Sequence, residues 1–338
     1  MGLIEKEHAL ANDRKENATQ ALFEQGVRKQ KTLIRPVNCV GVALHSGAAV
    51  SMTLTPGEKD SGILIRRTDL ADGKNLIAAR WDQVVGTTMC TTLGNEHDAT
   101  IGTVEHLMAA LYGCGVDNAV IEVDGPEIPI MDGSAQPFVF LIECAGLTEQ
   151  DAPLRAIEVL KAVCIEDGAC RAELRPAKRP SFTFEIDFAS AAVARQNISV
   201  TMINGTFKKE IARARTFGFA EDVEKLRAAG LARGGSLDNA VVVSGDEILN
   251  EDGLRYDDEF VRHKVLDAVG DLYLASGPIR GEFHGRCSGH GINNRLVRAL
   301  FADPEAWRLS LVGEDKRQVG SGVADLAIQP AEAIAASL

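Results

Sequence analysis

Hydrophobic and polar positions follow two different periods along this chain, and the changes of period divide it into segments. Residues alternate between apolar and polar at 50–56 (VSMTLTP) and at 171–176 (RAELRP), which predicts a strand ending in proline at each place. Between them, 148–153 (TEQDAP) is polar and ends in proline, and the pattern then begins again. The repeated opening indicates an internal duplication of one α+β unit, so we expect two domains with their boundary in this polar segment.

Other stretches have apolar residues at the spacing of an amphipathic helix. The first of them is expected to begin with Thr103 as its N-cap and to end at glycines 113 and 115. A glycine-rich turn, SGHGINN, leads into a last long helix. The segments with helical spacing are 103–115, 137–146, 219–230 and 259–275.

The helix expected at 259–275 carries a line of polar residues among apolar ones. His263, Asp267 and Asp271 are spaced four residues apart, so they fall within roughly 80° of one another around the helix. A histidine and an aspartate at this spacing can bind one metal ion from a single helix, as other paired ligands do. The alternative is a solvated helix face with a hydrogen bond between histidine and aspartate. The spacing alone leaves both interpretations open.

Composition excludes several classes of function. The chain has 338 residues, of which 45% are hydrophobic, which is enough for the cores of two domains. Its formal net charge of -12 argues against a general nucleic-acid or anionic-membrane surface. The seven cysteines are odd in number and form no CxxC pair, which indicates reduced thiols. No apolar run approaches a membrane span and the N-terminus lacks a secretory signal, so we expect a cytoplasmic protein without stable membrane insertion.

Histidine is scarce, and the positions of the histidines suggest one kind of chemistry. A zinc hydrolase needs three protein ligands, an open position for water, a carboxylate base and an acid for the leaving group. The sequence offers each of these groups, although a Glu-His pair on a helix or a glycine-flanked histidine is often only structural. The candidates are His106, His263 and Asp267 for the metal, Glu105 for the base, His290 for the acid, and Asp271 to orient an imidazole.

Several longer strings stand in order along the chain: TVEHLMAALYGCGVDN, EIPIMDGSAQPF, ARTFGF, NEDGLRYDDEFVRHKVLDAVGDL and SGHGINN. They closely resemble the UDP-3-O-acyl-N-acetylglucosamine deacetylases, zinc amidases of lipid A synthesis in Gram-negative bacteria. The resemblance runs from about Thr32 to about Arg308. It implies hydrolysis of the acetamide of UDP-3-O-(3-hydroxyacyl)-N-acetylglucosamine, which releases acetate and the free 2-amine.

The family resemblance also implies an architecture. We expect two similar α+β domains, each a small sheet layered against helices and each carrying an insert, with the active site between them. The insert of the second domain would form a hydrophobic passage for the acyl chain. A monomer is expected. The expected segments are an N-terminal extension at 1–28, helical or disordered, domain I at 29–150, domain II at 151–314 with its insert at about 217–250, and a C-terminal tail at 315–338.

Two motifs of the family place the metal ligands and their neighbours. The TVEH motif puts the general base on Glu105 and a zinc ligand on His106. The HKxLDxxGD motif supplies the remaining ligands, a substrate-contacting cation and the partner of the acid histidine. These are His263 and Asp267 for the metal, Lys264 for the substrate, and Asp271 as the partner. The same His₂Asp set would also accept Fe²⁺.

Two further motifs complete the site that the resemblance implies. The SGHG motif puts the acid on His290, and the ARTFGF motif puts an oxyanion-contacting hydroxyl on Thr216 and an apolar sugar contact on Phe217. Two other functions use the same residues: a zinc hydrolase that cleaves a different amide, and a non-catalytic module that holds zinc structurally and binds nucleotide sugars. The choice of substrate distinguishes the hydrolase of a different amide. A Glu105→Ala variant that keeps its function would favour the non-catalytic module.

Overall fold

A computed structural model describes residues 19–203 and 205–313 of the chain. It is a mixed α+β structure made of several small sheets and of helices that pack between them. Within the described residues, no helix is both long enough and apolar enough to cross a membrane. Residues 19–24 of the expected N-terminal extension are helical. Residues 1–18 of that extension and the expected tail at 315–338 lie outside the described residues.

Two five-stranded sheets repeat the same topology. Their orders are β2-β3-β9-β4-β5 and β12-β13-β20-β14-β15, and in each sheet only the third and fourth strands pair in parallel. The two strands predicted from alternation, β3 and β13, occupy the same position in the two sheets. The strands of the first sheet are β2 (Val37–Val42), β3 (Ala49–Pro56), β4 (Ile63–Arg67), β5 (Leu76–Ala78) and β9 (Ala119–Val123). Those of the second are β12 (Val163–Asp167), β13 (Cys170–Arg175), β14 (Ser181–Asp187), β15 (Arg195–Thr201) and β20 (Glu282–Arg286).

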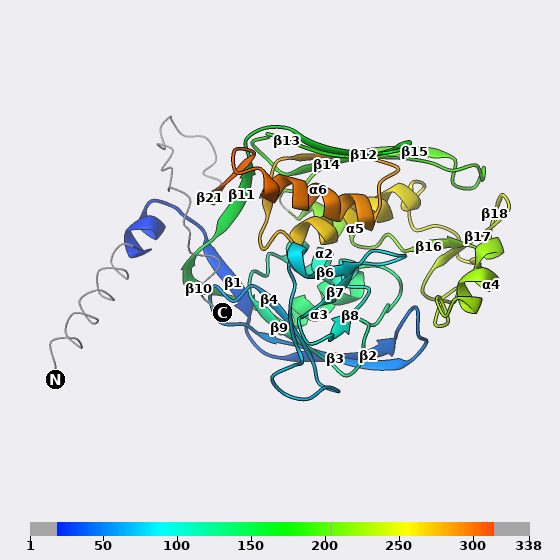
Figure 1. Cartoon of the computed structure of the whole chain (residues 1–338), viewed down its shortest axis with the longest axis horizontal. Coiled ribbons are helices and arrows are strands. Elements are labelled where there is room, and N and C mark those ends of the chain that lie inside the picture. The colour runs from blue at the N-terminus through cyan, green and yellow to red at the C-terminus, as the bar shows by residue number, and fades with distance from the viewer. Residues whose placement is uncertain (1–18, 204, 314–338) are drawn as a thin grey trace.

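Helices lie between these two sheets, as Figure 1 shows, and the core forms where they meet. Each sheet turns its apolar face inward because alternate residues of a strand point to the same side. In β3 the buried residues are Val50, Met52 and Leu54, and in β14 they are Phe182, Phe184 and Ile186. The helices between the sheets are α2 (Glu105–Cys114), α3 (Gln136–Ala145), α5 (Glu259–Tyr273) and α6 (His290–Ala302).

The predicted helices are present, but the start of α2 differs from the prediction. Thr103 is not the N-cap: its backbone has φ 57°, and its hydroxyl donates a hydrogen bond to Glu127 Oε1 at 2.9 Å. Val104 is the N-cap residue, and no side chain caps the helix. The predicted stop is confirmed, because Gly115 adopts the left-handed conformation that favours glycine.

Short elements surround the two main sheets. Strand β10 (Leu147–Pro153) pairs with β1 (Lys29–Leu33), so the polar segment in which we expected a boundary is itself a strand. The predicted insert contains helix α4 (Ala220–Ala228) beside a small sheet. The strands of that sheet are β16 (Phe217–Phe219), β17 (Val241–Ser244) and β18 (Glu247–Ile248). The remaining elements are β6 (Val84–Gly86), β7 (Thr92–Gly94), β8 (Thr100–Ile101), β11 (Arg155–Val159), β19 (Ile279–Arg280), β21 (Trp307–Leu311), the 3-10 turn at Trp81–Gln83 and the π turn at Phe207–Ile211.

The packing of α2 against α5 positions the chemistry. A Cβ atom on Gly270 of α5 would lie 2.0 Å from the carbonyl oxygen of Glu105, the first residue of α2. Only glycine allows the backbones to come this close. The start of α2 therefore lies directly against the middle of α5, where the polar line of that helix is located.

Candidate metal centre and its acid–base pair

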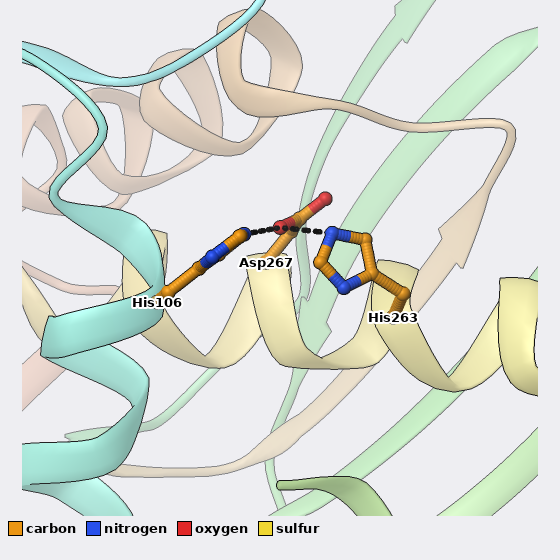
Figure 2. Close-up of side chains that lie close together, drawn as sticks. All are labelled: His106, His263 and Asp267. Atoms are coloured by element: carbon orange, nitrogen blue, oxygen red, sulfur yellow. Dashed lines mark ion pairs between the residues drawn. The ribbon is translucent and has the colours of Figure 1, made fainter. Parts of the chain in front are cut away.

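His106, His263 and Asp267 form a buried cluster (Figure 2). His106 comes from the first turn of α2, and the other two residues come from neighbouring turns of α5. The Nε2 atoms of His106 and His263 lie 3.6 Å and 3.4 Å from the same oxygen, Asp267 Oδ1. No more than 4% of any of these residues is exposed, so the interpretation of a solvated helix face is wrong.

The donor set fits a divalent metal ion. Two ligands that each lie about 2.0–2.1 Å from a tetrahedral ion are about 3.4 Å apart. The two contacts of Asp267 Oδ1 have this spacing, and all three donor atoms lie within 4.8 Å of one another. Two imidazoles and a carboxylate suit zinc and ferrous iron alike. The sequence prediction of these three residues as one ligand set is therefore matched by their placement.

The surroundings of His263 prepare its Nε2 atom to bind a metal. Its Nδ1–H donates a hydrogen bond of 3.1 Å to the carbonyl oxygen of Ala214, which leaves the lone pair on Nε2. Burial lowers the pKa of His263 to about 4, so the imidazole is neutral at physiological pH. A neutral ring with its lone pair directed at Asp267 is the form that ligates.

Lys264 lies beside the ligands rather than away from them. Its Nζ donates a hydrogen bond of 2.7 Å to Asp267 Oδ2, the oxygen that does not face the histidines. Burial by itself would raise the pKa of Asp267. The nearby His263 and Lys264 have the larger effect and hold the pKa of Asp267 well below its usual range. The carboxylate is therefore ionised, and Lys264 already has one anionic partner.

Glu105 and His290 face each other next to the cluster. Glu105 Oε1 lies 3.7 Å from His290 Nε2, and the backbone N–H of Thr91 donates to Glu105 Oε2 at 3.1 Å. Burial raises the pKa of Glu105, which makes the carboxylate a stronger base. Burial works against a cationic His290, but Asp271 and Glu105 outweigh it and raise the pKa of His290 to about 10. At neutral pH His290 is therefore an imidazolium that faces the carboxyl group of Glu105.

Asp271 receives a hydrogen bond at each oxygen. His290 Nδ1–H donates to Oδ2 at 2.9 Å, the side-chain amide of Asn293 donates to the same oxygen at 2.9 Å, and the Thr91 hydroxyl donates to Oδ1 at 2.6 Å. Three donors around one carboxylate hold it in a fixed position beside His290. The sequence analysis did not identify Thr91 or Asn293. Asn293 stands in the SGHGINN string, but no spacing links Thr91 to this helix.

Thr216 and Phe217 follow the segment that contacts His263. The Phe217 ring meets His263 edge to face at 6.3 Å between centroids and Phe260 at 5.0 Å. The Thr216 N–H donates to Gly133 O at 2.8 Å, whereas its hydroxyl makes no hydrogen bond with the described residues. The Thr216 hydroxyl is therefore available to form a hydrogen bond with another molecule.

A buried ion pair fixes this segment, and it too was missed from the sequence. Arg215 donates through Nε and Nη2 to the two oxygens of Glu259 at 2.9 Å and 3.0 Å. Glu259 also accepts the backbone N–H groups of Arg215 and Arg255. Glu259 is the first residue of α5, so the pair links the Thr216 segment to the helix that carries the ligands.

Comparison with known proteins agrees with this geometry. Residues 30–302 match the model of a family described as LpxC, UDP-3-O-acyl N-acetylglycosamine deacetylase. The UDP-3-O-acyl-N-acetylglucosamine deacetylase of Phenylobacterium zucineum is 52% identical over 286 residues, which cover 85% of this chain and 98% of that protein. The proteins of the same name from Shewanella sp. W3-18-1 and Shewanella baltica OS155 are each 52% identical over 282 residues, or 83% of this chain and 92% of theirs. With its buried metal-site candidate, the chain belongs to the LpxC family of metal-dependent deacetylases of lipid A biosynthesis.

Proposed function

We propose that this chain hydrolyses the acetamide of UDP-3-O-(3-hydroxyacyl)-N-acetylglucosamine with zinc held by His106, His263 and Asp267. The products are acetate and the free 2-amine. One observation carries the proposal: in a chain of this family, a buried His₂Asp set lies next to a carboxylate and an imidazolium that face each other at 3.7 Å. A site of this kind supplies both of the proton transfers that amide hydrolysis requires.

The first part of the reaction makes the amide carbonyl open to attack by water. When bound, the metal ion would polarise the acetyl oxygen and lower the pKa of water. Glu105 accepts the proton of the attacking water, for which its raised pKa suits it. The free hydroxyl of Thr216 donates a hydrogen bond to the oxyanion that develops on the acetyl group.

The second part is departure of the amine, which is a poor leaving group until it is protonated. His290 is cationic at neutral pH, and its Nε2–H faces the side of the site where Glu105 lies. It gives this proton to the nitrogen as the C–N bond breaks, and Asp271 keeps the ring oriented throughout. Glu105 then holds the proton taken from water and can return it to His290 across the same gap.

The remaining roles concern the substrate. Phe217 offers an apolar surface to the sugar. Lys264 already donates a hydrogen bond to Asp267, and it offers its charge to a polar group of the substrate as well. We assign the acyl passage to the insert at 217–250, where α4 and its small sheet lie. Burial of the chain stabilises the complex by about 0.8 kcal/mol for each methylene.

The expected domains, oligomeric state and location also form part of this proposal. The repeated sheet topology supports domains at 29–150 and 151–314 with the site between them, since Glu105 and His106 come from the first and the other charged site residues from the second. All of these residues come from one chain, which supports a monomer. All seven cysteines are free thiols, which supports a reducing, cytoplasmic location.

The test measures how fast the purified protein deacetylates the proposed substrate before and after a chelator removes its metal. We expect activity to disappear with a chelator and to return with about one equivalent of zinc, because residues 19–203 and 205–313 contain one such ligand set. Restoring the metal with ferrous iron instead compares the two ions that the donors accept. A folded, metal-loaded protein that does not turn over this substrate would favour another amide or a binding role.

Two variants test the assigned proton transfers separately from metal binding. Glu105→Ala and His290→Ala should each lower kcat by at least about a hundredfold while the protein still binds zinc, since general acid–base groups contribute about 10²–10⁴-fold. Near-parent kcat in both zinc-loaded variants would contradict the mechanism. Removing the acyl chain from the substrate should weaken binding strongly, and equal turnover of a chain-free analogue would contradict the passage.

A further inference from the structure

A turn at 131–134, in the first half of the chain, contacts the segment that carries Thr216. The N–H of Thr216 donates to the carbonyl oxygen of Gly133 at 2.8 Å, and the carbonyl oxygen of Thr216 accepts from the N–H of Val241 at 2.8 Å. The backbone of Thr216 is therefore held from two sides, by this turn and by β17. The turn lies in the string EIPIMDGSAQPF, and the proposed reaction uses none of its residues.

Gly133 also lies against the side chain of Thr216. It is buried and has φ 81°. A Cβ atom at this position would lie 2.0 Å from the carbonyl oxygen of Asn239 and 3.3 Å from the Cγ2 methyl of Thr216. Threonine has few allowed rotations about its Cα–Cβ bond, so the place of its methyl also determines the direction of its hydroxyl. The close approach of Gly133 therefore bears on where the Thr216 hydroxyl points.

The side chain of Asp132 ties the turn to the second half of the chain. Its Oδ1 accepts hydrogen bonds from the N–H and the hydroxyl of Ser134, at 3.0 Å and 2.7 Å, which close the turn. Its Oδ2 lies 2.9 Å from Arg255 Nη1. The same Nη1 donates to the carbonyl oxygen of Arg213 at 3.0 Å, three residues before Thr216. Arg255 therefore joins the turn to the segment that leads to Thr216.

The pair of Asp132 and Arg255 is better suited to fixing a local geometry than to stabilising the whole fold. Their side chains are 30% and 27% exposed, and ion pairs that solvent reaches contribute at most about 1 kcal/mol to stability. The buried pair of Arg215 and Glu259 already fixes the residue before Thr216. What the turn adds is a contact with the backbone and the methyl of Thr216 itself.

We propose that the turn at 131–134 is a positioning element for the reaction, in which Gly133 holds Thr216 and the pair of Asp132 with Arg255 holds the turn. This inference rests on the proposed function, in which the Thr216 hydroxyl donates to the oxyanion. Such a donor is effective when it is already directed at the place where charge develops. The oxyanion forms only after the substrate has bound, so loss of positioning lowers kcat and leaves KM nearly unchanged.

Hydrogen exchange of the full-length protein tests the anchoring of Thr216 without depending on turnover. We expect peptides that contain Thr216 to exchange at least about threefold faster in Asp132→Ala than in the parent, because the turn loses both its closure and its link to Arg255. The matched control is Glu143→Ala, which removes a different ion pair between the two halves of the chain, with Lys208 at 2.8 Å. These peptides should exchange in the control as in the parent. Parent-like exchange in Asp132→Ala would overturn the proposal.

A double-mutant cycle on the zinc-loaded protein tests whether the turn acts through the hydroxyl. Thr216→Val should lower kcat about a hundredfold, as loss of an oxyanion donor does. Gly133→Ala should lower kcat about tenfold with little change in KM, because its Cβ displaces Thr216. In the Thr216→Val protein, Gly133→Ala should have no further effect on kcat. The control Gly73→Ala, at an exposed glycine with φ 82° and no atom within 4 Å of the new Cβ, adds similar backbone strain and should keep the parent kcat.

The outcomes of the cycle separate this proposal from the reaction on which it rests. Equal losses of kcat from Gly133→Ala with and without the Thr216 hydroxyl would overturn the proposal, as would parent-like kcat in Gly133→Ala or in Thr216→Val. If Gly133→Ala does not fold, Asp132→Ala takes its place in the cycle with the same expectations. Failure of the proposed reaction would show instead as absent turnover in the metal-loaded parent, and hydrogen exchange then decides whether the turn anchors Thr216.

Discussion

The hydroxyl of Thr91 donates a hydrogen bond of 2.6 Å to Asp271, although 180 residues separate the two in the chain. The backbone N–H of the same threonine donates to Glu105. One buried residue therefore contacts both the proposed base and the partner of the proposed acid. This makes Thr91 the link between the two proton-transferring groups, in addition to their own contact across 3.7 Å.

Removal of this hydroxyl should reduce activity without removing the metal. Thr91→Val keeps the backbone contact with Glu105 but leaves Asp271 Oδ1 without its donor, which costs about 1–3 kcal/mol at a buried acceptor. We expect kcat to fall about tenfold, which corresponds to about 1.4 kcal/mol. Thr91→Ser should retain most of the activity. Steady-state kinetics with zinc content measured in parallel checks this, and parent-like kcat in the valine variant would exclude the positioning role.

The pH dependence of the reaction should have two limbs, and Asp271 should set the upper one. Activity requires ionised Glu105 and protonated His290, so it rises as Glu105 loses its proton and falls as pH passes the pKa of His290. Asp271 is a main cause of the rise of that pKa to about 10. In Asp271→Asn the pKa should fall towards the ordinary value near 6.5, and the alkaline limb should move to lower pH.

The measurement is kcat/KM across the pH range for the parent and for Asp271→Asn, with metal content determined at each pH. Asp246→Asn, a change at an exposed aspartate on a loop near β18, supplies the control for loss of one negative charge. Its alkaline limb should coincide with that of the parent. If Asp271→Asn also keeps the parent limb, His290 is not the group that the limb reports.

The buried pair of Arg215 and Glu259 should contribute strongly to stability. Arg215→Ala leaves the Glu259 carboxylate buried without its cation, and breaking such a pair costs about 3–5 kcal/mol. Arg195 forms an exposed ion pair with Glu185, so Arg195→Ala should change stability by less than about 1 kcal/mol. Denaturant unfolding of both variants measures the difference. Equal stabilities would mean that the buried pair does not hold the Thr216 segment to α5.

Local sequence patterns predicted the helices that carry the site residues, but they did not predict the contacts that hold those residues in place. The four-residue spacing of His263, Asp267 and Asp271 is a property of one helix, so it could be identified without a structure. Glu105 and His290 could be proposed from the residue types that a zinc hydrolase needs, and the family strings then assigned the same roles to them. Thr91 gave no signal, because its contacts depend on how its loop passes over α5 and not on neighbours in sequence.

One local expectation differed from the structure for an identifiable physical reason. Thr103 has a residue type that favours N-caps, but Glu127 binds its hydroxyl and its backbone is left-handed. A tertiary partner outweighs the local preference there. The polar segment at 148–153, where we expect the domain boundary, pairs with β1, a partner more than a hundred residues away, and no local pattern reveals that pairing. The parallel pairing of β14 with β20 is equally inaccessible to a local pattern.

Gly270 provides the most direct test of the close packing of α2 against α5. Gly270→Ala would place its Cβ 2.0 Å from the carbonyl oxygen of Glu105, far inside van der Waals contact, so the start of α2 has to move. Because Glu105 and His106 both lie there, we expect loss of zinc affinity and of activity together, with destabilisation of about 1–3 kcal/mol. In Gly218→Ala the new Cβ has no atom within 4 Å, so its stability should remain near that of the parent. Zinc affinity and unfolding free energy are measured for both variants. A Gly270→Ala protein that binds zinc like the parent would show that the site tolerates separation of the two helices, and the glycine would then serve another purpose in the family motif.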